Sequence, residues 1–184
     1  MTTSLAIAAS TMNRWFSFDV ESVGLHGQGF AVGWVVLEDG VEVSSGYAAC
    51  PIDAAKGARS DREWVEVNVC PHLPEPTHDG VLAVRDAFWA AWLTEKERGA
   101  VMVSDCGWPV EARFLAACID DDPELRRWEG PYPLLDVANL LLAAGKNPLG
   151  TYPRLDSEQP AHHPTNDARQ SARVGWDALK RRQN

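Results

Sequence analysis

The N-terminal part of the chain shows the alternation of apolar and polar residues that is typical of β-strands. Residues 15–21 combine aromatic and β-branched side chains, and two further apolar stretches cover residues 30–39 and 40–48. The sequence Glu38-Asp39-Gly40 at the junction of these stretches favours a tight hairpin turn. The pattern therefore predicts three consecutive strands in a meander.

In the middle of the chain, apolar residues recur at spacings of three and four, which predicts helices. Residues 50–78 precede them and are rich in Pro, Gly and charge, so we expect an irregular connection there. Asp79 is expected to cap a helix that ends at Gly99. The predicted inner face of this helix consists of Leu82, Val84, Ala87, Phe88, Ala91, Trp92 and Leu93.

In the last part of the chain, the pattern predicts strands that alternate with helices. Residues 100–104 are typical of a short buried strand, and Pro109 is suited to the first turn of the next helix. Asp136 is expected to cap a helix after a brief strand, and Pro164 to open the last helix after a proline-rich loop at 147–161. The predicted inner positions of these helices are Phe114, Leu115, Cys118, Ala168, Ala172, Trp176 and Leu179.

The order of these elements predicts the fold class. A three-strand meander followed by alternating strands and helices indicates one mixed α/β sheet flanked by helices. Residues 14–184 are expected to form a single domain, with residues 1–13 as a flexible leader. A chain of 184 residues that is 45% hydrophobic and 23% charged has an ordinary globular composition, which excludes the disordered, collagen-like and coiled-coil classes.

The charge balance restricts the partners. Lys and Arg number 17 against 26 Asp and Glu, which gives a formal net charge of -9. A broad basic surface for duplex DNA is therefore not expected. A compact acidic site that holds cations is compatible with this charge, because bound cations invert the local sign.

The cysteines and the hydropathy pattern indicate the cellular compartment in which we expect the protein. The four cysteines form no C-x-x-C pair, and we find no membrane-spanning stretch and no signal peptide. We therefore expect reduced thiols in a cytoplasmic protein without a membrane partner. A zinc site is the alternative use of these residues, but scattered structural cysteines are favoured because the spacing fits no common zinc pattern. The ligands of that alternative site would be Cys50, Cys70, His72 and His78.

One pair of carboxylates lies in a predicted central strand, where burying a charged group costs free energy. Asp19 and Glu21 are two residues apart at the end of an apolar strand, so their side chains point to the same face of the sheet. Two unpaired carboxylates in a central strand would cost several kcal/mol unless cations compensate their charge. Three other Asp-x-Glu pairs lie in polar segments, where we expect solvated surface: Asp61-Glu63, Asp122-Glu124 and Asp156-Glu158.

Two further places supply candidate acids and a histidine. His162 precedes the last helix and Asp167 lies about one turn inside it, so both can approach one pocket. Asp105 ends the buried strand at 100–104, and Glu111 lies near the start of the following helix. Taken singly, each of these residues has an ordinary alternative role, such as capping a turn or complementing a helix dipole.

Four segments, in this order along the chain, resemble the DEDDh group of 3′-5′ exonucleases: FDVES, SDCGWPVEARFL, PLLDVANLL and HHPTNDARQSA. The group includes polymerase proofreading domains, RNase T and oligoribonuclease, and the resemblance runs from about Trp15 to the C-terminus. It implies a ribonuclease H-like fold and two divalent cations, Mg²⁺ or Mn²⁺. By this resemblance, Asp19 and Glu21 match the first acidic motif, and His162 and Asp167 match the last.

The middle motif departs from the family pattern. Glu111 stands where the family has an Asp before the apolar pair Phe114-Leu115, and Asp105 stands where Asn is usual. Asp105 is slightly favoured as the remaining ligand because its position at a strand end, next to Cys106 and a glycine, could reach a metal. Glu111 is the alternative.

The resemblance implies hydrolysis of the terminal phosphodiester at the 3′ end of single-stranded RNA or DNA, with release of a nucleoside 5′-monophosphate. Asp19, Glu21, Asp105 and Asp167 would hold the two cations, and His162 would take a proton from the attacking water. The candidates for stacking on terminal bases are His26, Phe30 and Trp108, although a place in the core is favoured for each aromatic residue. The last helix is basic on one side, either as a guide for a nucleic-acid backbone or as a solvated face, through Arg169, Arg173, Lys180, Arg181 and Arg182.

Two alternatives have the same fold. One is a catalytically idle nucleic-acid-binding protein, and the other is a proofreading partner of a polymerase. The complete set of acids with a histidine favours the enzyme. The choice between RNA and DNA and the formation of a homodimer stay open at this point.

Overall fold

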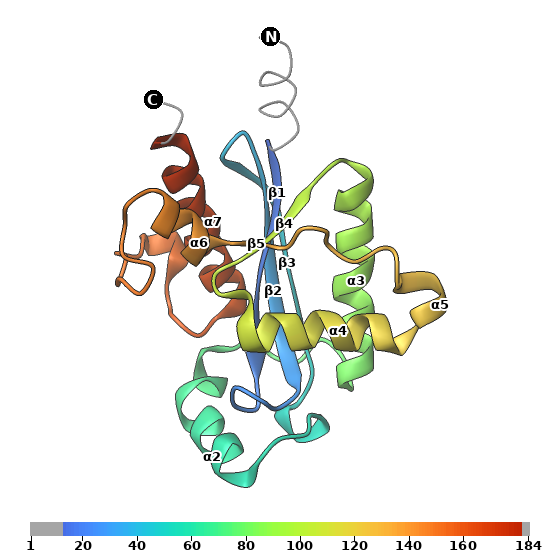
Figure 1. Ribbon diagram of the computed structural model, residues 1–184. Coiled ribbons are helices and arrows are strands. Elements are labelled where there is room, and N and C mark those ends of the chain that lie inside the picture. The colour runs from blue at the N-terminus through green and yellow to red at the C-terminus, as the bar shows by residue number, and fades with distance from the viewer. Residues whose placement is uncertain (1–12, 182–184) are drawn as a thin grey trace.

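The computed structural model describes residues 13–181, which form a mixed five-stranded sheet with helices on both faces (Figure 1). The strand order is β3-β2-β1-β4-β5. Strand β1 pairs antiparallel with β2 and parallel with β4, while β2–β3 is antiparallel and β4–β5 is parallel. The strands are β1 (Arg14–Ser22), β2 (Gly29–Glu38), β3 (Val41–Ala49), β4 (Val101–Ser104) and β5 (Leu135–Asp136).

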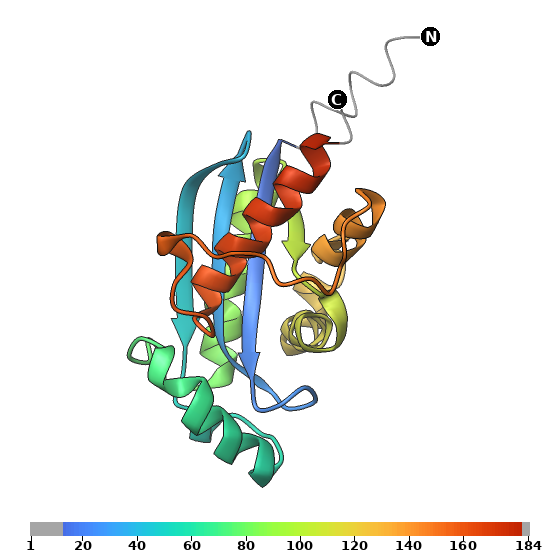
Figure 2. The same ribbon diagram turned by 90° about the vertical axis from the view of Figure 1, so that its left-hand side faces the viewer.

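Helix α3 covers one face of the sheet, and α6 and α7 cover the other (Figures 1 and 2). Helix α2 lies beyond the end of the sheet at which β1 finishes, and α4 crosses in front of the sheet edge in the view of Figure 1. The α-helices are α2 (Arg59–Asn68), α3 (Val81–Glu97), α4 (Ala112–Asp121), α5 (Pro123–Arg126), α6 (Val137–Ala143) and α7 (Pro164–Arg181). Four shorter helical turns are η1 (Ile52–Ala54), η2 (Cys70–His72), η3 (Gly107–Glu111) and η4 (Asp156–Glu158).

The alternation of side chains along β1 determines which residues can reach a common site. Phe16 and Phe18 belong to the core under α3, whereas Trp15 belongs to the core under α6 and α7. Because side chains alternate along a strand, Asp19 and Glu21 lie on the Trp15 face, towards α7. The sequence therefore places both carboxylates on the face that α7 covers.

Helix α7 packs very closely on this face. The Ser17 hydroxyl donates a hydrogen bond to the Ala168 carbonyl at 3.1 Å. A Cβ on Gly33, which pairs with Asp19 across β1 and β2, would lie 2.1 Å from the Thr165 backbone nitrogen. The first turn of α7 can approach β2 because residue 33 has no side chain. This contact positions the start of α7 opposite Asp19.

The opposite face carries an aromatic core. The Phe88 ring on α3 lies 5.6 Å from Phe16, 5.1 Å from Phe18 and 5.2 Å from Phe114 on α4, measured between ring centroids. Such edge-to-face and tilted pairs are favourable beyond their burial. The core fixes β1 against α3 and α4 and so gives the acidic face a rigid support.

Several local predictions are confirmed. Asp39 and Gly40 have positive φ angles of 51° and 81°, as a tight hairpin turn requires. The Asp136 carboxylate accepts a hydrogen bond from the Asn139 backbone nitrogen at 3.1 Å and caps α6. Helix α7 begins at Pro164, and Ala168 is among its buried inner positions.

Other local predictions are wrong. Residues 50–78 were expected to be irregular, but they contain α2. Val65 is the single buried residue of this helix, so the segment has no repeating apolar pattern that would predict a helix. Asp79 does not cap α3, because the N-cap is Gly80 and no side chain bonds there. Leu82 is 53% exposed rather than inward. Pro109, in contrast, lies in the helical turn η3, which continues directly into α4 at Ala112, so its predicted place in a first helical turn is confirmed.

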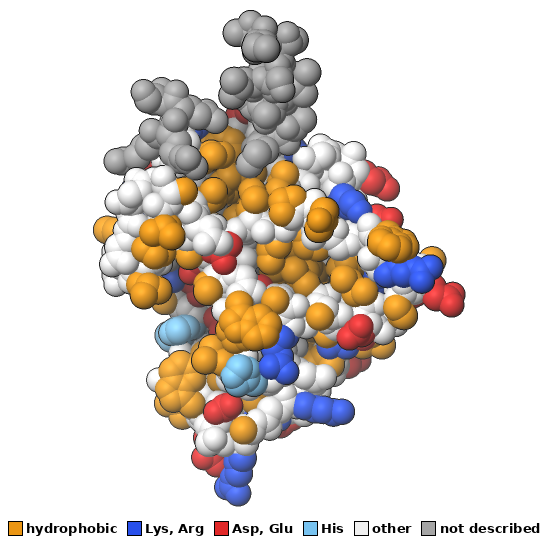
Figure 3. Space-filling model, in the orientation of Figure 1, with side chains coloured by type: hydrophobic (Ala, Val, Ile, Leu, Met, Phe, Trp, Pro, Cys, Tyr) orange, Lys and Arg blue, Asp and Glu red, His pale blue; other side chains and the backbone are white. Residues whose placement is uncertain are grey.

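The predicted leader at residues 1–13 lies almost entirely outside the described residues. One face of the described part exposes large apolar side chains. In Figure 3 they gather over α4 and over the chain that follows α5. Trp108, Trp128 and Tyr132 are the exposed aromatic rings of this region, with exposed fractions of 70%, 81% and 102%.

Candidate active site

The strand acids lie beside an edge of β1 that no strand covers. Strand β4 pairs with β1 from Trp15 to Phe18 and stops there. Beyond Phe18, Asp19 and Glu21 are half-buried and face α7. The turn that follows β4 therefore fills the space next to Asp19, and this turn carries Asp105 and Glu111.

The last motif meets the first one through the start of α7. The His162 backbone N–H donates to Asp167 Oδ2 at 3.0 Å, and His162 has a φ of 60°. This left-handed conformation is uncommon outside glycine, but His adopts it more readily than most residues. The bond holds the His162 loop over the first turn of α7. One ligand atom from each of Glu21, His162 and Asp167 lies within 4.8 Å of the others.

Both candidates of the middle motif lie close to the strand acids. Glu111 is buried, and its carboxylate accepts hydrogen bonds from its own backbone and from that of Val20. Asp105 keeps an exposed side chain that accepts a hydrogen bond from Ser171 on α7. The charges of both act on Asp19, whereas Glu111 also acts on Glu21. The structure thus brings Asp105 and Glu111 to one site.

The acids raise one another's pKa values. Burial raises the pKa of Asp19 well above its usual range, and the charges of Glu21 and Asp167 add to the effect. Burial together with the charges of Asp167 and Glu111 raises the pKa of Glu21 to about 7. The pKa of Glu111 also rises to about 7, mainly through burial and then through the charge of Asp105. Such perturbation is typical of functional sites.

Arg154 is the cation in this cluster, and sequence reasoning missed it. Its guanidinium lies 2.6 Å from Asp167 Oδ1 and donates a 2.8 Å hydrogen bond to the Glu158 carbonyl. Burial raises the pKa of Asp167, while the charge of Arg154 opposes the rise. Arg154 lies in the proline-rich loop, where no spacing or motif distinguishes it from a surface arginine.

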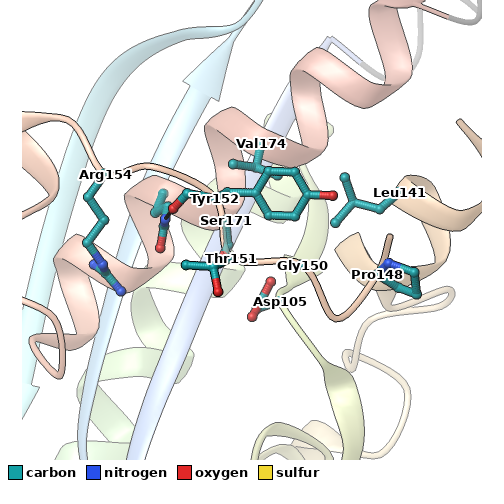
Figure 4. A pocket seen from close by; sticks show the side chains of 10 residues that line it. Asp105, Leu141, Pro148, Gly150, Thr151, Tyr152, Arg154, Ser171 and Val174 are labelled. Atoms are coloured by element: carbon teal, nitrogen blue, oxygen red, sulfur yellow. Dashed lines mark hydrogen bonds between the residues drawn. The ribbon is translucent and has the colours of Figure 1, made fainter. Parts of the chain in front are cut away.

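A cavity of about 220 Å³ opens beside this cluster (Figure 4). Asp105 borders it from the end of β4, Arg154 and Tyr152 from the proline-rich loop, and Ser171 from α7. Partial desolvation at this cavity raises the pKa of Asp105, and the nearby charge of Asp136 adds to the rise. Asp105 is therefore accessible to solvent and to ligands through this cavity.

The ring of His162 lies against the segment that was expected to be irregular. Its centroid is 6.3 Å from the Trp64 ring on α2 and 6.4 Å from the His72 ring in η2. His163, the next residue, packs on Tyr47 at 5.7 Å instead. The contribution of Trp64 and His72 to the site could not be foreseen, because residues 50–78 gave no pattern that placed them near His162.

The other sequence candidates separate into two groups. His26 and Trp108 are exposed, as stacking would need, whereas Phe30 is 1% exposed and belongs to the core, which is the role the sequence favoured for it. On the last helix, Arg169 pairs with Glu42 and Arg173 pairs with Glu158, both at 2.6 Å. These two arginines are therefore used within the protein, and Arg182 lies outside the described residues.

The alternative zinc site does not form. All four cysteines are free thiols. Within residues 13–181, the side chains of Cys50, Cys70, His72 and His78 do not come together as a ligand group. None of the described helices is long and apolar enough to cross a lipid bilayer.

Comparison with known proteins supports the fold. No family model matches the chain, and no curated protein matches it in sequence. Among solved structures, the chain is similar to Pop2p of S. pombe in its Mg²⁺ and Mn²⁺ bound form, with a TM-score of 0.60 and 12% sequence identity. The similarity covers 94% of this chain and 85% of that chain. It confirms the predicted ribonuclease H-like mixed sheet flanked by helices.

The raised pKa values predict how stability depends on pH without divalent cations. Glu21 and Glu111 have pKa values near 7 in the folded protein against a usual 4.5, so the folded state binds more protons than the unfolded state between these limits. The free energy of unfolding in EDTA is therefore expected to fall as the pH rises from about 4.5 to about 7. Urea unfolding at a series of pH values measures this slope.

The variant Glu111→Gln should flatten the slope, because it removes one of the two titrating groups. Glu63→Gln on the exposed side of α2 is the matched control and should leave the slope of the wild type unchanged. A wild-type protein whose stability increases over the same pH range would contradict the prediction.

Proposed function

We propose that the protein is a metal-dependent 3′-5′ exonuclease of the DEDDh type. In this proposal it hydrolyses the terminal phosphodiester of single-stranded RNA or DNA and releases nucleoside 5′-monophosphates. The observation that supports it best is the convergence of Glu21, His162 and Asp167 within 4.8 Å, next to Asp19. The free cysteines fit a cytoplasmic enzyme with reduced thiols.

The donor set fits hard divalent cations. The group that comes together within residues 13–181 consists of two carboxylates and one imidazole and includes no cysteine. The nearby charges on Asp19 oppose full ionisation of these carboxylates without added positive charge. Asp19, Glu21 and Asp167 would hold two Mg²⁺ or Mn²⁺ ions, the cations named for the similar Pop2p structure. When bound, the cations supply an activated water and stabilise the charge on the leaving 3′ oxygen.

His162 is proposed to take the proton of the attacking water. Its backbone holds Asp167, while its ring is exposed to the solvent side of the acids, where a substrate end would enter. Trp64 and His72 flank the ring and restrict its orientation. A ring nitrogen of His162 can therefore accept a proton without disturbing the contact that positions the loop.

A fourth carboxylate completes the proposed ligand set. Sequence reasoning favours Asp105, which faces the cavity and acts electrostatically on Asp19. Glu111 is the stronger candidate on electrostatic grounds, because it is buried and its charge acts on both Asp19 and Glu21. The two residues are compared directly below.

A second candidate function is a catalytically idle nucleic-acid-binding protein with the same fold. The ion pair between Arg154 and Asp167 favours it, since a cation already neutralises one of the acids. The pKa values of Asp19, Glu21 and Glu111 are raised by burial and by the charges of neighbouring acids, which favours a site that needs cations. The exonuclease is therefore the better supported function.

Asp19→Asn is expected to abolish turnover and to raise the stability of the metal-free protein, because the amide removes the charge at the centre of the repulsion. Wild-type protein should shorten a 5′-labelled single strand one nucleotide at a time with Mg²⁺ or Mn²⁺, and EDTA should stop the reaction. Thermal unfolding checks the fold of the variant. Inactivity of the wild type on every oligonucleotide, or full activity of Asp19→Asn, would refute the proposed enzyme.

His162→Ala is expected to lower the rate by about 10²- to 10⁴-fold, which is the usual contribution of a general base. A single-turnover assay with saturating Mn²⁺ measures this loss at the chemical step. His163→Ala is the matched control and should lose little activity, because His163 packs on Tyr47 instead. The opposite ranking would assign the base to His163.

Asp105→Asn and Glu111→Gln distinguish the two middle acids, because each amide keeps the size of the side chain but loses its charge. The true ligand should lose metal affinity and activity by orders of magnitude, whereas the other residue should change both only slightly. Mn²⁺ titration by calorimetry measures affinity independently of turnover. Equal, small effects of both substitutions would exclude a fourth carboxylate ligand at these positions.

A further inference from the structure

An apolar groove of about 650 Å³ lies between α4 and the chain that returns from α5 to β5. On α4 it is lined by small and apolar side chains, among them Ala112 and Ile119. The returning chain contributes Trp128, Tyr132 and Leu134. Figure 3 shows these elements on the face where hydrophobic side chains gather. A patch of this kind on a protein surface usually marks a binding site.

The groove begins at the candidate active site. Its liner Ala112 directly follows Glu111. At the same end, a Cβ on Gly107 would lie 3.3 Å from Leu134 Cδ2, and Gly107 belongs to the turn that follows Asp105. At the other end, a Cβ on Gly130 would lie 3.2 Å from Ile119 Cδ1. The two walls therefore run antiparallel, and the groove leads from the acids along the length of α4, about 15 Å.

The chemistry of the groove suits bases rather than a phosphate backbone. Trp128 and Tyr132 present almost their whole ring surfaces to solvent, and Trp108 is similarly exposed on the turn beside the acids. Arg127 is the single charged residue among the described liners, and its guanidinium lies 5.9 Å from the Trp128 ring. Aromatic rings with a nearby arginine are the usual elements of a surface that stacks single-stranded bases.

We propose that this groove binds the bases that precede the 3′ end of a single-stranded nucleic acid while the terminal phosphodiester lies at the acids. This inference rests on the proposed exonuclease function, and it adds the surface that holds the rest of the substrate. Stacking requires no basic track, which is consistent with a net charge of -9. The single Arg127 supplies attraction to the neighbouring phosphates.

The test compares a dinucleotide with a single strand of about ten nucleotides, each with a 5′ fluorophore and a non-hydrolysable terminal linkage, by fluorescence anisotropy with Mn²⁺. Trp128→Ala and Tyr132→Ala should each weaken binding of the longer strand by about 5- to 100-fold, the usual effect of removing one stacked ring. Binding of the dinucleotide should not change. Trp128→Phe keeps an aromatic face and should restore most of the affinity.

Leu82→Ala on α3 is the control for removal of an exposed apolar side chain, and it should bind the longer strand like the wild type. Because Trp128 and Tyr132 are exposed, their removal should leave the unfolding temperature close to that of the wild type. Arg127→Gln should make the affinity for the longer strand less dependent on salt, by about one in the slope of log K against log salt.

The outcomes separate this inference from the proposed function. In one outcome, the wild type hydrolyses the strand with Mn²⁺, but Trp128→Ala and Tyr132→Ala bind the longer strand as tightly as the wild type. This result overturns the proposed role of the groove and leaves the proposed exonuclease function standing. Loss of affinity in both variants without any hydrolysis by the wild type supports the groove and overturns the exonuclease. A dimer that Trp128→Ala converts to a monomer, with oligonucleotide affinity unchanged, makes the groove an interface between two copies and overturns the inference.

Discussion

Repulsion among carboxylates at the end of β1 is the constraint on which the rest of the structure depends. Burial raises the pKa values of Asp19, Glu21, Glu111 and Asp167, and the charges of neighbouring acids add to the rise at Asp19, Glu21 and Glu111. Each such group costs several kcal/mol if it is left charged and unpaired. The fold must therefore supply stability elsewhere to hold these groups together.

The support comes from β1 itself. This strand lies in the middle of the sheet, between β2 and β4, and both of its faces are buried under helices. On the α3 face, the Phe16 and Phe18 rings pack around Phe88. On the α7 face, the Ser17 hydroxyl bonds to the Ala168 carbonyl and Gly33 admits the first turn of α7. The acids are thus attached to a strand that is packed on both faces, which suits a site that must hold its geometry.

The sequence predicted the parts of the site that follow from local periodicity or from a motif. Strand alternation placed Asp19 and Glu21 on one face, and the spacing of His162 and Asp167 around Pro164 placed them at one helix start. It could not place Arg154, because the ion pair with Asp167 is a tertiary contact made by an irregular loop. It also could not decide between a core role and an exposed role for His26, Phe30 and Trp108, because strand alternation does not show which residues a neighbouring segment will cover.

The pairing of arginines with carboxylates of the same chain limits the positive charge that is available to bind a polyanion. Arg14, Arg85, Arg126, Arg169 and Arg173 all pair with carboxylates of the same chain, so they offer little free charge to a phosphate backbone. In the proposed function, affinity for nucleic acid would come from cations held by the acids at one end and from ring surfaces along the groove at the other. The proposed requirement for divalent cations and the exposed aromatic rings would then both follow from the small amount of unpaired positive charge on the protein. Such an enzyme would bind the substrate through its terminal phosphate and its bases. Salt would weaken this binding less than it weakens binding to a row of basic side chains.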